Sequence, residues 1–287
     1  MARAAAKTGA DPTVMVAIEQ YFPKKERIIE DGLAYGILPF GRSFVWLARF
    51  NSVRNWMVRA AEKSFPGLWG CMMCRKRYID EKLMESVNNI NAVVNLGTGF
   101  DTRAYRLPEL SKIPVWELDQ LKNIKPKQIR LIKVFGAIPS HVKLAPIDFD
   151  TEDICTILKL HGYSTDERTF FIWEAVTQYL TEEGIRATFD FLAKASSGSR
   201  LAFTYVRKDF IEGRARYGWD KIYEDYVTKN IWIFGMEPGA WPSFLKEYGW
   251  RIIEDIGYDE MAEKYVKPTG RILISTPVER MVYAEKL

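Results

Sequence analysis

Two glycines and two acids in the middle of the chain have the types and spacing to hold a nucleoside. Gly97 and Gly99 directly follow the apolar run 92–96, and Glu117 and Asp119 end the next apolar run along the chain. Glycines let the backbone approach a ligand closely, and a carboxylate about 20 residues later accepts hydrogen bonds from ribose hydroxyls. Either Glu117 or Asp119 could hold a ribose in this way. Taken alone, the glycine pair is equally well explained as a tight turn.

The residue at the third glycine position separates two classes of nucleoside ligand. The dinucleotide fingerprint has a glycine three residues after the second one, where this chain has Thr102. A ligand with a ribose and an adenine but no pyrophosphate fits this departure, and S-adenosylmethionine is such a compound. We therefore expect S-adenosylmethionine as the cofactor. A nicotinamide-dependent oxidoreductase is the alternative that shares the sheet and the acidic second strand.

The segments that must position these residues alternate between strand and helix patterns. The helix that begins after Thr181 is the clearest, because an N-cap threonine precedes two acids, Glu182 and Glu183. Repeated alternation predicts an α/β fold of the Rossmann-like, doubly wound type with a mostly parallel sheet. Seven strands are expected, the last two as a closing pair: 92–96, 115–118, 142–147, 169–173, 200–205, 251–256 and 279–285.

Changes in residue pattern and composition along the sequence divide the chain into four parts. We expect an N-terminal helical cap (1–90), a cofactor-binding α/β core (91–206), an aromatic-rich lid insertion (207–248) and C-terminal strands that complete the core (249–287). The aromatic residues of the insertion either line a pocket for an apolar or aromatic molecule or pack into a core of their own. Its basic residues either attract an acidic substrate or form a solvated face: Arg207, Lys208, Arg214 and Arg216.

Composition excludes several classes of protein. The chain has 287 residues, 47% hydrophobic and 27% charged, so it has enough apolar surface to fold. Its net charge of +4 is too weak to indicate a nucleic acid partner. The apolar stretch 36–50 contains Arg42 and Arg49 and is shorter than the roughly 18 residues of a membrane span. We expect no membrane partner, no secretion signal and a cytoplasmic location.

The cysteines favour the same compartment and give no metal site. Cys71, Cys74 and Cys155 cannot all be paired, which is typical of a reducing environment. Cys71 and Cys74 have the spacing of half a zinc site, but no second pair is present and neither histidine lies at finger spacing. We expect structural or incidental cysteines and no metal.

The segment VVNLGTGFDTRAYRL (Val93–Leu107) resembles the signature of the leucine carboxyl methyltransferase family, which includes many bacterial S-adenosylmethionine-dependent O-methyltransferases. Further segments match the family pattern in order: Arg75–Asp80, Glu117–Asp119, Ile147–Phe149, Glu174–Thr181 and Glu279–Leu287. The resemblance implies a class I methyltransferase fold. The chain departs from the family with Thr98 where alanine is commoner, and with Gly32 where Asp31 is usually followed by proline.

The resemblance also implies roles for single residues. The implied cofactor-binding residues are Arg75 for the methionine carboxylate, Gly97 and Gly99 beneath the cofactor, Asp119 for the ribose, Asp148 and Phe149 around the adenine, and Glu174 for the amino group and the sulfonium region. Arg75 has the alternative of a solvated helix charge, and Asp148 that of an N-cap for a helix over 150–158. Asp101 and Arg103 are expected to support the glycine turn.

The sequence contains little that looks like a general base. His141 and His161 lie in loops away from the expected reaction centre. Tyr205 and Tyr179 are candidate acceptor-side groups, and Glu174 and Tyr205 are the candidate catalytic residues. The lack of an evident base favours an acceptor that is already acidic. We expect methyl transfer to a carboxylate or hydroxyl of a small apolar or aromatic molecule, with a protein carboxyl methyltransferase and a non-catalytic binding module as alternatives.

Overall fold

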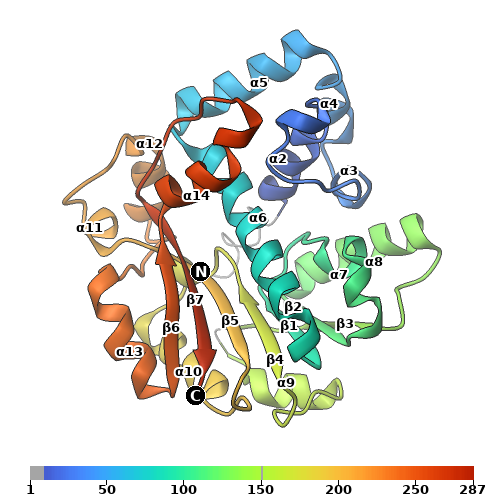
Figure 1. Cartoon of the computed structure of the whole chain (residues 1–287), viewed down its shortest axis with the longest axis vertical. Coiled ribbons are helices and arrows are strands. Elements are labelled where there is room, and N and C mark those ends of the chain that lie inside the picture. The colour runs from blue at the N-terminus through green and yellow to red at the C-terminus, as the bar shows by residue number, and fades with distance from the viewer. Residues whose placement is uncertain (1–9, 150) are drawn as a thin grey trace.

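The computed structural model describes residues 10–149 and 151–287 and has a seven-stranded sheet at its centre (Figure 1). The strands are β1 (Ala92–Leu96), β2 (Val115–Asp119), β3 (Val142–Pro146), β4 (Thr169–Trp173), β5 (Arg200–Val206), β6 (Trp250–Ile256) and β7 (Glu279–Lys286). Their order across the sheet is β3-β2-β1-β4-β5-β7-β6. The first five strands are parallel, and β7 runs antiparallel between β5 and β6. The predicted α/β sheet with its closing pair is confirmed.

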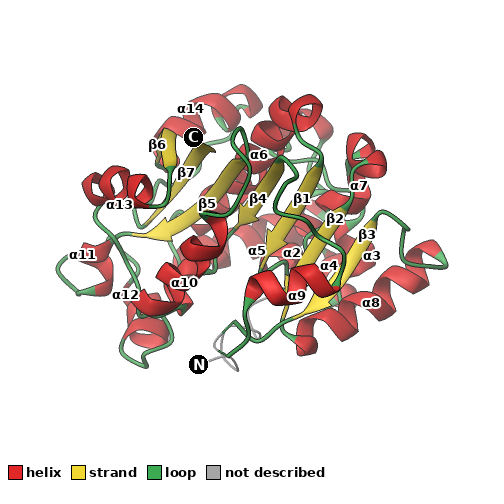
Figure 2. Cartoon of the chain, turned by 90° about the horizontal axis from the view of Figure 1, so that it is seen from below, coloured by secondary structure: helices red, strands yellow, loops and turns green. Residues whose placement is uncertain are grey.

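Helices cover both faces of this sheet (Figure 2). They are α2 (Asp11–Glu19), α3 (Ala34–Ile37), α4 (Arg42–Leu47), α5 (Asn51–Ser64), α6 (Leu68–Ser86), α7 (Arg103–Arg106), α8 (Leu121–Phe135), α9 (Ile154–Leu160), α10 (Glu182–Leu192), α11 (Lys208–Ile211), α12 (Asp220–Ile222), α13 (Trp241–Glu247) and α14 (Tyr258–Tyr265). Single turns of 3₁₀ or wider helix occur at 24–26, 87–89, 108–112, 177–179, 223–227, 238–240 and 267–269. Within the described residues, no helix has both the length and the apolar character needed to cross a bilayer.

The central strands are apolar throughout because they are buried from both sides. All five side chains of β1 and of β4 are buried. Side chains alternate across a strand, so Phe170 and Ile172 pack in the apolar cluster that includes α6, whereas Phe171 and Trp173 pack in the cluster that includes α9 and α10. This two-sided burial is typical of parallel sheets.

The long helix α6 carries Arg75, and a carboxylate fixes its beginning. Glu62 accepts hydrogen bonds from the backbone N–H groups of Gly67 and Trp69, both at 2.9 Å. These donors have no partner within the helix, so the acid caps them and favours the positive end of the helix dipole. The indole of Trp69 donates to Glu19 at 2.9 Å, which joins α6 to α2.

The segment 207–248 contributes to the core as well as to a pocket. Trp241 and Phe244 of α13 contact the aromatic rings of β5 and α10, with ring centroids 4.8 Å apart for Phe203 and Trp241 and 5.2 Å apart for Phe189 and Phe244. The predicted N-cap of α10 is also present, because Thr181 Oγ1 accepts from the N–H of Gly184 at 3.1 Å. The second half of this segment is thus part of the sheet's own packing.

Candidate functional site

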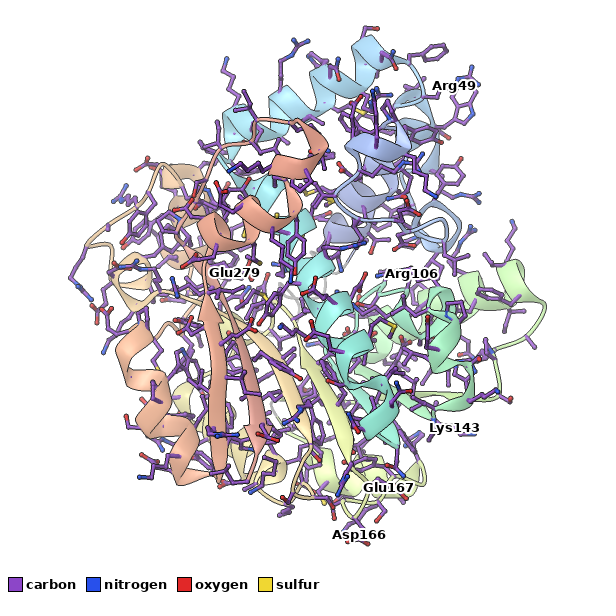
Figure 3. All side chains as sticks on the ribbon, in the orientation of Figure 1. Arg49, Arg106, Lys143, Asp166, Glu167 and Glu279 are labelled. Carbon is purple, nitrogen blue, oxygen red and sulfur yellow. The ribbon has the colours of Figure 1, made fainter. Side chains whose placement is uncertain are left out.

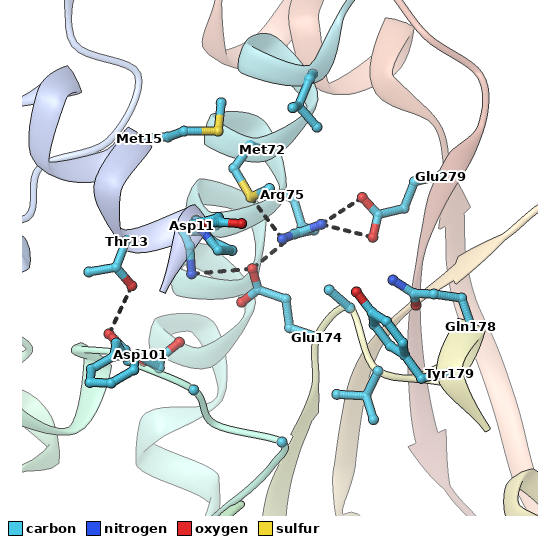
Figure 4. Close-up of a pocket in the computed structure, with 18 of the residues that line it drawn as sticks. Asp11, Thr13, Met15, Met72, Arg75, Asp101, Glu174, Gln178, Tyr179 and Glu279 are labelled. Atoms are coloured by element: carbon cyan, nitrogen blue, oxygen red, sulfur yellow. Dashed lines mark hydrogen bonds and ion pairs between the residues drawn. The ribbon is translucent and has the colours of Figure 1, made fainter. Parts of the chain in front are cut away.

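A cavity of about 610 Å³ opens at the carboxyl ends of β1, β2 and β4. The segments that follow these strands line it, at 97–101, 119–120 and 174–176, and α2, α5 and α6 supply other parts of its wall. The strand order reverses between β1 and β4, and ligands of open α/β sheets bind at this switch point. Figure 4 shows the charged side chains that meet there.

The glycine turn after β1 is bare because nothing larger fits. Gly97 has φ +74°, and a Cβ at this position would lie 2.3 Å from Cγ2 of Val176. Both the backbone conformation and the lack of space therefore exclude a side chain. Gly99 also has a positive φ of +49°, and its N–H donates to Oδ2 of Asp119 at 2.6 Å. The turn and the carboxylate after β2 thus form one hydrogen-bonded unit in the cavity wall.

Asp119 is held by three N–H groups. In addition to Gly99, the backbone of Gln120 and the amide of Asn123 donate to Oδ1, at 2.7 and 2.8 Å. Burial raises the pKa of Asp119, and these donors offset part of that effect. Each carboxylate oxygen has two lone pairs, so this orientation still leaves capacity to accept from a ligand.

Glu117 is the other acid that the sequence offered for a ribose, and it does not line the cavity. It is fully buried, where its carboxylate pairs with Lys127 at 2.7 Å and accepts from the hydroxyl of Tyr105 at 2.6 Å. Lys127 also donates to Oγ1 of Thr98 at 2.9 Å, which supports the glycine turn from below. Glu117 therefore has a structural position behind the turn.

Arg75 lies in the cavity wall with two carboxylates around it. Its Nε donates to Glu174 at 2.9 Å, and Nη1 donates to both oxygens of Glu279 at 2.9 and 2.7 Å. Its third nitrogen, Nη2, contacts the sulfur of Met72 at 2.8 Å. Arg75 is 4% exposed, which excludes a solvated helix charge. Because a thioether is a weak acceptor, Nη2 is the donor best placed for a ligand carboxylate.

Glu174 follows β4 and is surrounded by cations. Arg103 donates to it at 2.8 Å, and Nζ of Lys76 lies 3.3 Å away, in addition to Arg75. Burial alone would raise the pKa of Glu174, but Lys76, Arg103 and Arg75 together hold it well below its usual range. The carboxylate is therefore ionised at neutral pH and can accept hydrogen bonds from a cationic ligand.

The start of α7 is already occupied by an acid. Asp101 accepts from the N–H of Arg103 at 2.7 Å and pairs with its guanidinium, which confirms the predicted support of the turn. Thr102 donates to Asp31 at 2.5 Å, so the segment with glycine in place of proline also holds this turn. A pyrophosphate needs free N–H groups at such a helix start. The arrangement thus opposes a dinucleotide.

The two residues proposed for the adenine differ in their positions. Phe149 lines the cavity, whereas Asp148 does not. The backbone N–H of Asp148 donates to Glu152 at 2.7 Å. Its alternative role as a helix cap is wrong, because α9 begins after Asp153, whose carboxylate accepts from the N–H of Thr156 at 2.7 Å. Residue 150, the start of the helix expected there, lies outside the described residues.

Tyr205 is not brought to the cavity. It is fully buried, contacts Trp241 and donates to Asp255 at 2.9 Å. The predicted strand ends one residue too early, because β5 continues to Val206, and Val206 lines the cavity. Side chains alternate along a strand, so Tyr205 points to the face covered by α13. Tyr179, the other acceptor-side candidate, does line the cavity.

Several cavity residues were missed by reasoning from sequence. Lys76 is next to Arg75 in the chain, so a second cation beside the first was an available signal. Glu279 lies 204 positions from Arg75, and only the place of β7 beside β5 brings it to the cavity. Thr13 also lines the cavity, and it donates to the carbonyl of Phe100 at 3.2 Å, which ties α2 to the glycine turn.

One side of the cavity is apolar. Seven lining residues belong to a single hydrophobic cluster: Phe65, Leu68, Val206, Trp219, Ile222, Tyr226 and Trp232. The ring of Tyr179 lies 6.2 Å from that of Trp232, which connects this cluster to the segment after β4. Together with the packing of α13, this divides the aromatic residues of 207–248 between the cavity wall and the core of the sheet.

The basic residues of the same segment do not line the cavity. Arg207 pairs with Asp209 at 2.7 Å, Arg214 with Glu212 and Glu237, each at 2.7 Å, and Arg216 with Asp220 at 3.3 Å. Arg214 and Arg216 are about half exposed. These residues form an ion-paired surface, which favours the solvated face of the two alternatives.

The strand order, the antiparallel seventh strand and the crevice at the strand ends define the class I methyltransferase fold. Solved structures with this fold include a DUF574 family protein from Streptomyces avermitilis, which is 14% identical with a TM-score of 0.55 and covers 82% of this chain and 91% of that one. A Thermobifida fusca protein named as a methyltransferase is 12% identical with a TM-score of 0.54, covering 82% and 88%.

The particular family follows from the sequence comparison. Residues 11–193 match the leucine carboxyl methyltransferase family, and the chain belongs to it. A Mycobacterium avium protein named as an S-adenosyl-L-methionine-dependent methyltransferase is 28% identical over 187 residues, 63% of this chain and 62% of that protein. A Mycobacterium tuberculosis relative with the same name is 34% identical over 147 residues, 50% and 46%. The matches thus span about three fifths of these relatives' length or less.

Proposed function

We propose that this protein transfers a methyl group from S-adenosylmethionine to a carboxylate or hydroxyl of a small apolar molecule. The observation that carries the proposal is one cavity with two unlike sides. On one side, the bare turn at Gly97 is joined to Asp119, and the ion-paired Arg75 and Glu174 lie close by. On the other side is the apolar cluster of the lining residues. A cofactor and a hydrophobic acceptor can therefore occupy adjoining spaces.

The charged side has the donors and acceptors that this cofactor needs. Asp119 would accept from the ribose hydroxyls, and the space above Gly97 lets the nucleoside lie against the backbone. The methionine carboxylate would bind Nη2 of Arg75 in place of the weak sulfur contact, with Lys76 beside it. Glu174 would accept from the methionine ammonium, and Phe149 would cover the adenine.

The protein's task in methyl transfer is positioning. The bound cofactor supplies a methyl group attached to a cationic sulfur. The apolar cluster would hold the acceptor in line with that group, with the reacting atoms about 3 Å apart, and exclude water. No histidine of the described residues lines the cavity. His141 and His161 each lie 2.9 Å from a backbone carbonyl elsewhere. A carboxylate acceptor needs no base, so this wall favours an acidic acceptor.

Thermal unfolding with added ligands tests the cofactor. S-adenosylmethionine and its demethylated product should both raise the melting temperature, because a ligand of the folded state stabilises it. NAD should not, since Asp101 occupies the helix start that a pyrophosphate requires. Stabilisation by NAD and not by S-adenosylmethionine would refute the proposed class. Incubation with S-adenosylmethionine and a panel of aromatic acids, phenols and peptide acids, with the demethylated product measured, then tests the acceptor.

A further inference from the structure

The surface of α4 and the first half of α5 exposes large apolar side chains. We call residues 40–59 the aromatic face; its exposed aromatic residues are Phe40, Phe44, Trp46, Phe50 and Trp56. Phe40 and Trp56 are each 59% exposed, more than a monomeric surface normally leaves for such side chains in one cluster. The rings of Trp46 and Phe50 are in contact, with centroids 6.4 Å apart, and the other three rings belong to the same stretch of consecutive elements.

Two segments on this side of the molecule contain basic residues and no acid. Residues 32–61 contain four arginines and no Asp or Glu. A second segment, 120–147, contains six Lys or Arg and again no acid. With ten of the 41 basic residues in these two segments, the rest of the chain has 31 basic and 37 acidic residues. Arg54 is buried and Lys127 is buried against Glu117, so eight of these ten basic residues can contribute positive charge to the surface.

The two basic segments lie side by side. The second segment includes α8, and Arg130 of α8 donates to the carbonyl of Gly36 in α3 at 2.6 Å. A Cβ on Gly36 would lie 3.4 Å from Val134, so the two helices are in van der Waals contact. In Figure 1, α4, α3 and α8 follow one another along one edge of the molecule. Val134 and Phe135 at the end of α8 are also exposed, so α8 extends the basic and apolar surface.

Cations and rings are combined within the aromatic face. The guanidinium of Arg49 lies over the ring of Trp46 at 3.4 Å and over that of Phe50 at 4.6 Å. Figure 3 shows Arg49 at the outer edge of the molecule. Arg59 is exposed on α5, one turn from Trp56. Guanidinium groups that stay beside aromatic rings keep their charge at the depth where such rings enter a bilayer interface.

We propose that the aromatic face, extended by α8, binds the surface of a bilayer that contains anionic phospholipids. Tryptophan and phenylalanine insert at the headgroup level, while arginine and lysine pair with lipid phosphates. A second copy of the chain fits less well, because a two-fold interface would bring two positively charged surfaces together. A nucleic acid also fits less well, since exposed aliphatic residues of α8 such as Ile129 would meet a charged backbone.

This surface adjoins the cavity through α5. The outer side of α5 carries Trp56, while Ala60, Ala61 and Ser64 at its end line the cavity. An apolar acceptor dissolved in the bilayer would then have a short path to the apolar cluster. That consequence rests on the proposed function, whereas the docking itself does not. The expectation of no membrane partner came from the lack of a spanning segment, and surface binding requires none.

Vesicle flotation tests the proposal on the full chain. The protein should float with vesicles of phosphatidylcholine containing about 30% phosphatidylglycerol, float poorly with phosphatidylcholine alone, and be released by high salt. The double variant Arg49→Gln/Arg59→Gln should bind about 25-fold more weakly, because each cation near an anionic surface contributes roughly fivefold. The matched control is Lys194→Gln/Lys246→Gln, which removes two exposed cations on the opposite side and should bind normally.

A second pair of variants tests the apolar contribution. Phe40→Ser/Trp56→Ser should also lose binding, whereas Ile272→Ser, at a side chain that is 98% exposed elsewhere, should not. Unchanged melting temperatures show that each variant is folded. Equal binding to both vesicle types would overturn the proposal. It would also be overturned if the two controls, Lys194→Gln/Lys246→Gln and Ile272→Ser, lost as much vesicle binding as the variants of the aromatic face. The proposal would also be overturned if Phe40→Ser/Trp56→Ser left flotation with vesicles unaffected but abolished another interaction of the protein. That interaction would be either self-association or binding to a single-stranded oligonucleotide.

Discussion

The two sides of the cavity are built by different forces. On the charged side, Arg75, Glu174 and Asp119 have their positions fixed by named hydrogen bonds of 2.6–2.9 Å. On the apolar side, Ile222 and Trp232 are held by packing in one cluster. Hydrogen-bonded charges in a low dielectric depend on every partner, whereas packing tolerates substitution that keeps volume and polarity. The charged side is therefore specified for one ligand, and the apolar side is open to variation.

The largest effect is expected from Glu174→Gln. The change leaves three buried cations, Arg75, Lys76 and Arg103, with one negative charge fewer. Breaking a buried ion pair by removing one partner costs about 3–5 kcal/mol, so the free energy of unfolding should fall by about that amount. Chemical denaturation followed by circular dichroism measures it. The matched control is Glu182→Gln on α10, where the exposed pair with Arg186 should leave the unfolding midpoint nearly unchanged.

A similar small change in both variants would contradict the comparison. It would mean that the carboxylate of Glu174 contributes no more to stability than a surface acid, and that the charged side is not preorganised. Calorimetry under conditions where the variant is folded then measures ligand binding independently of the loss of stability. S-adenosylhomocysteine should bind the Glu174→Gln variant more weakly even under conditions where the variant is fully folded, because the acceptor for its ammonium has lost its charge.

The next effect concerns Asp119→Asn. Loss of the charge on the acceptor of a ribose hydroxyl should weaken binding of S-adenosylhomocysteine by about 1–3 kcal/mol, which calorimetry measures directly. Glu117→Gln is the matched control, since Glu117 is buried behind the turn and pairs with Lys127. It should reduce stability and leave the affinity of the folded protein nearly unchanged. The opposite pattern would assign the ribose to Glu117.

Asp119 and Glu174, the two carboxylates of the charged side, should become protonated at different pH values. Burial raises the pKa of Asp119, so its contribution to stability is present at low pH and is lost as the pH rises through its folded value. Although burial opposes it, the surrounding cations lower the pKa of Glu174, whose contribution is present above its unfolded pKa and lost as the pH falls. Between neutral pH and the ordinary aspartate value of 3.8, Asp119 gains a proton before Glu174 does.

Ligand affinity reports that proton. Binding of S-adenosylhomocysteine should weaken as the pH is lowered from neutral toward the ordinary aspartate value of 3.8, because a protonated Asp119 accepts fewer hydrogen bonds from the ribose. The Asp119→Asn variant cannot gain this proton, so its affinity should change much less over the same range. An equal decline in both proteins would place the titrating group elsewhere and would detach Asp119 from the ligand.

Local patterns in the sequence predicted the elements better than the contacts between them. The apolar runs that became β1 and β4 have the predicted bounds, because two-sided burial leaves a continuous signal. Spacing predicted the glycine turn and a carboxylate at the end of β2, and the family resemblance favoured Asp119 over Glu117. Tyr205 was misplaced, because a strand extended by one residue puts Val206 at the cavity instead. The pairing of Arg75 with Glu279 depends on the place of β7 in the sheet, which no local pattern contains.

The smallest effect is expected on the apolar side. Tyr226 lies 5.3 Å from the ring of Trp232, in a tilted contact. Such aromatic pairs contribute about 0.5–1.5 kcal/mol beyond their buried area, so Tyr226→Ala should weaken binding of an apolar fluorescent probe such as anilinonaphthalene sulfonate by a few-fold. Affinity for S-adenosylhomocysteine should stay the same, since no charged group of the cavity is touched.

The same segment provides the control for that variant. Tyr217 is partly buried, but it does not line the cavity and its hydroxyl donates to Asp209 at 2.5 Å. Tyr217→Ala should therefore leave probe binding unchanged. The contrary outcome is that Tyr226→Ala weakens binding of S-adenosylhomocysteine as strongly as binding of the probe. The two sides of the cavity would then act as one coupled site, and the apolar side would help to hold the cofactor. If Tyr226→Ala weakened binding of the probe alone, the apolar side and the charged side of the cavity would bind different ligands.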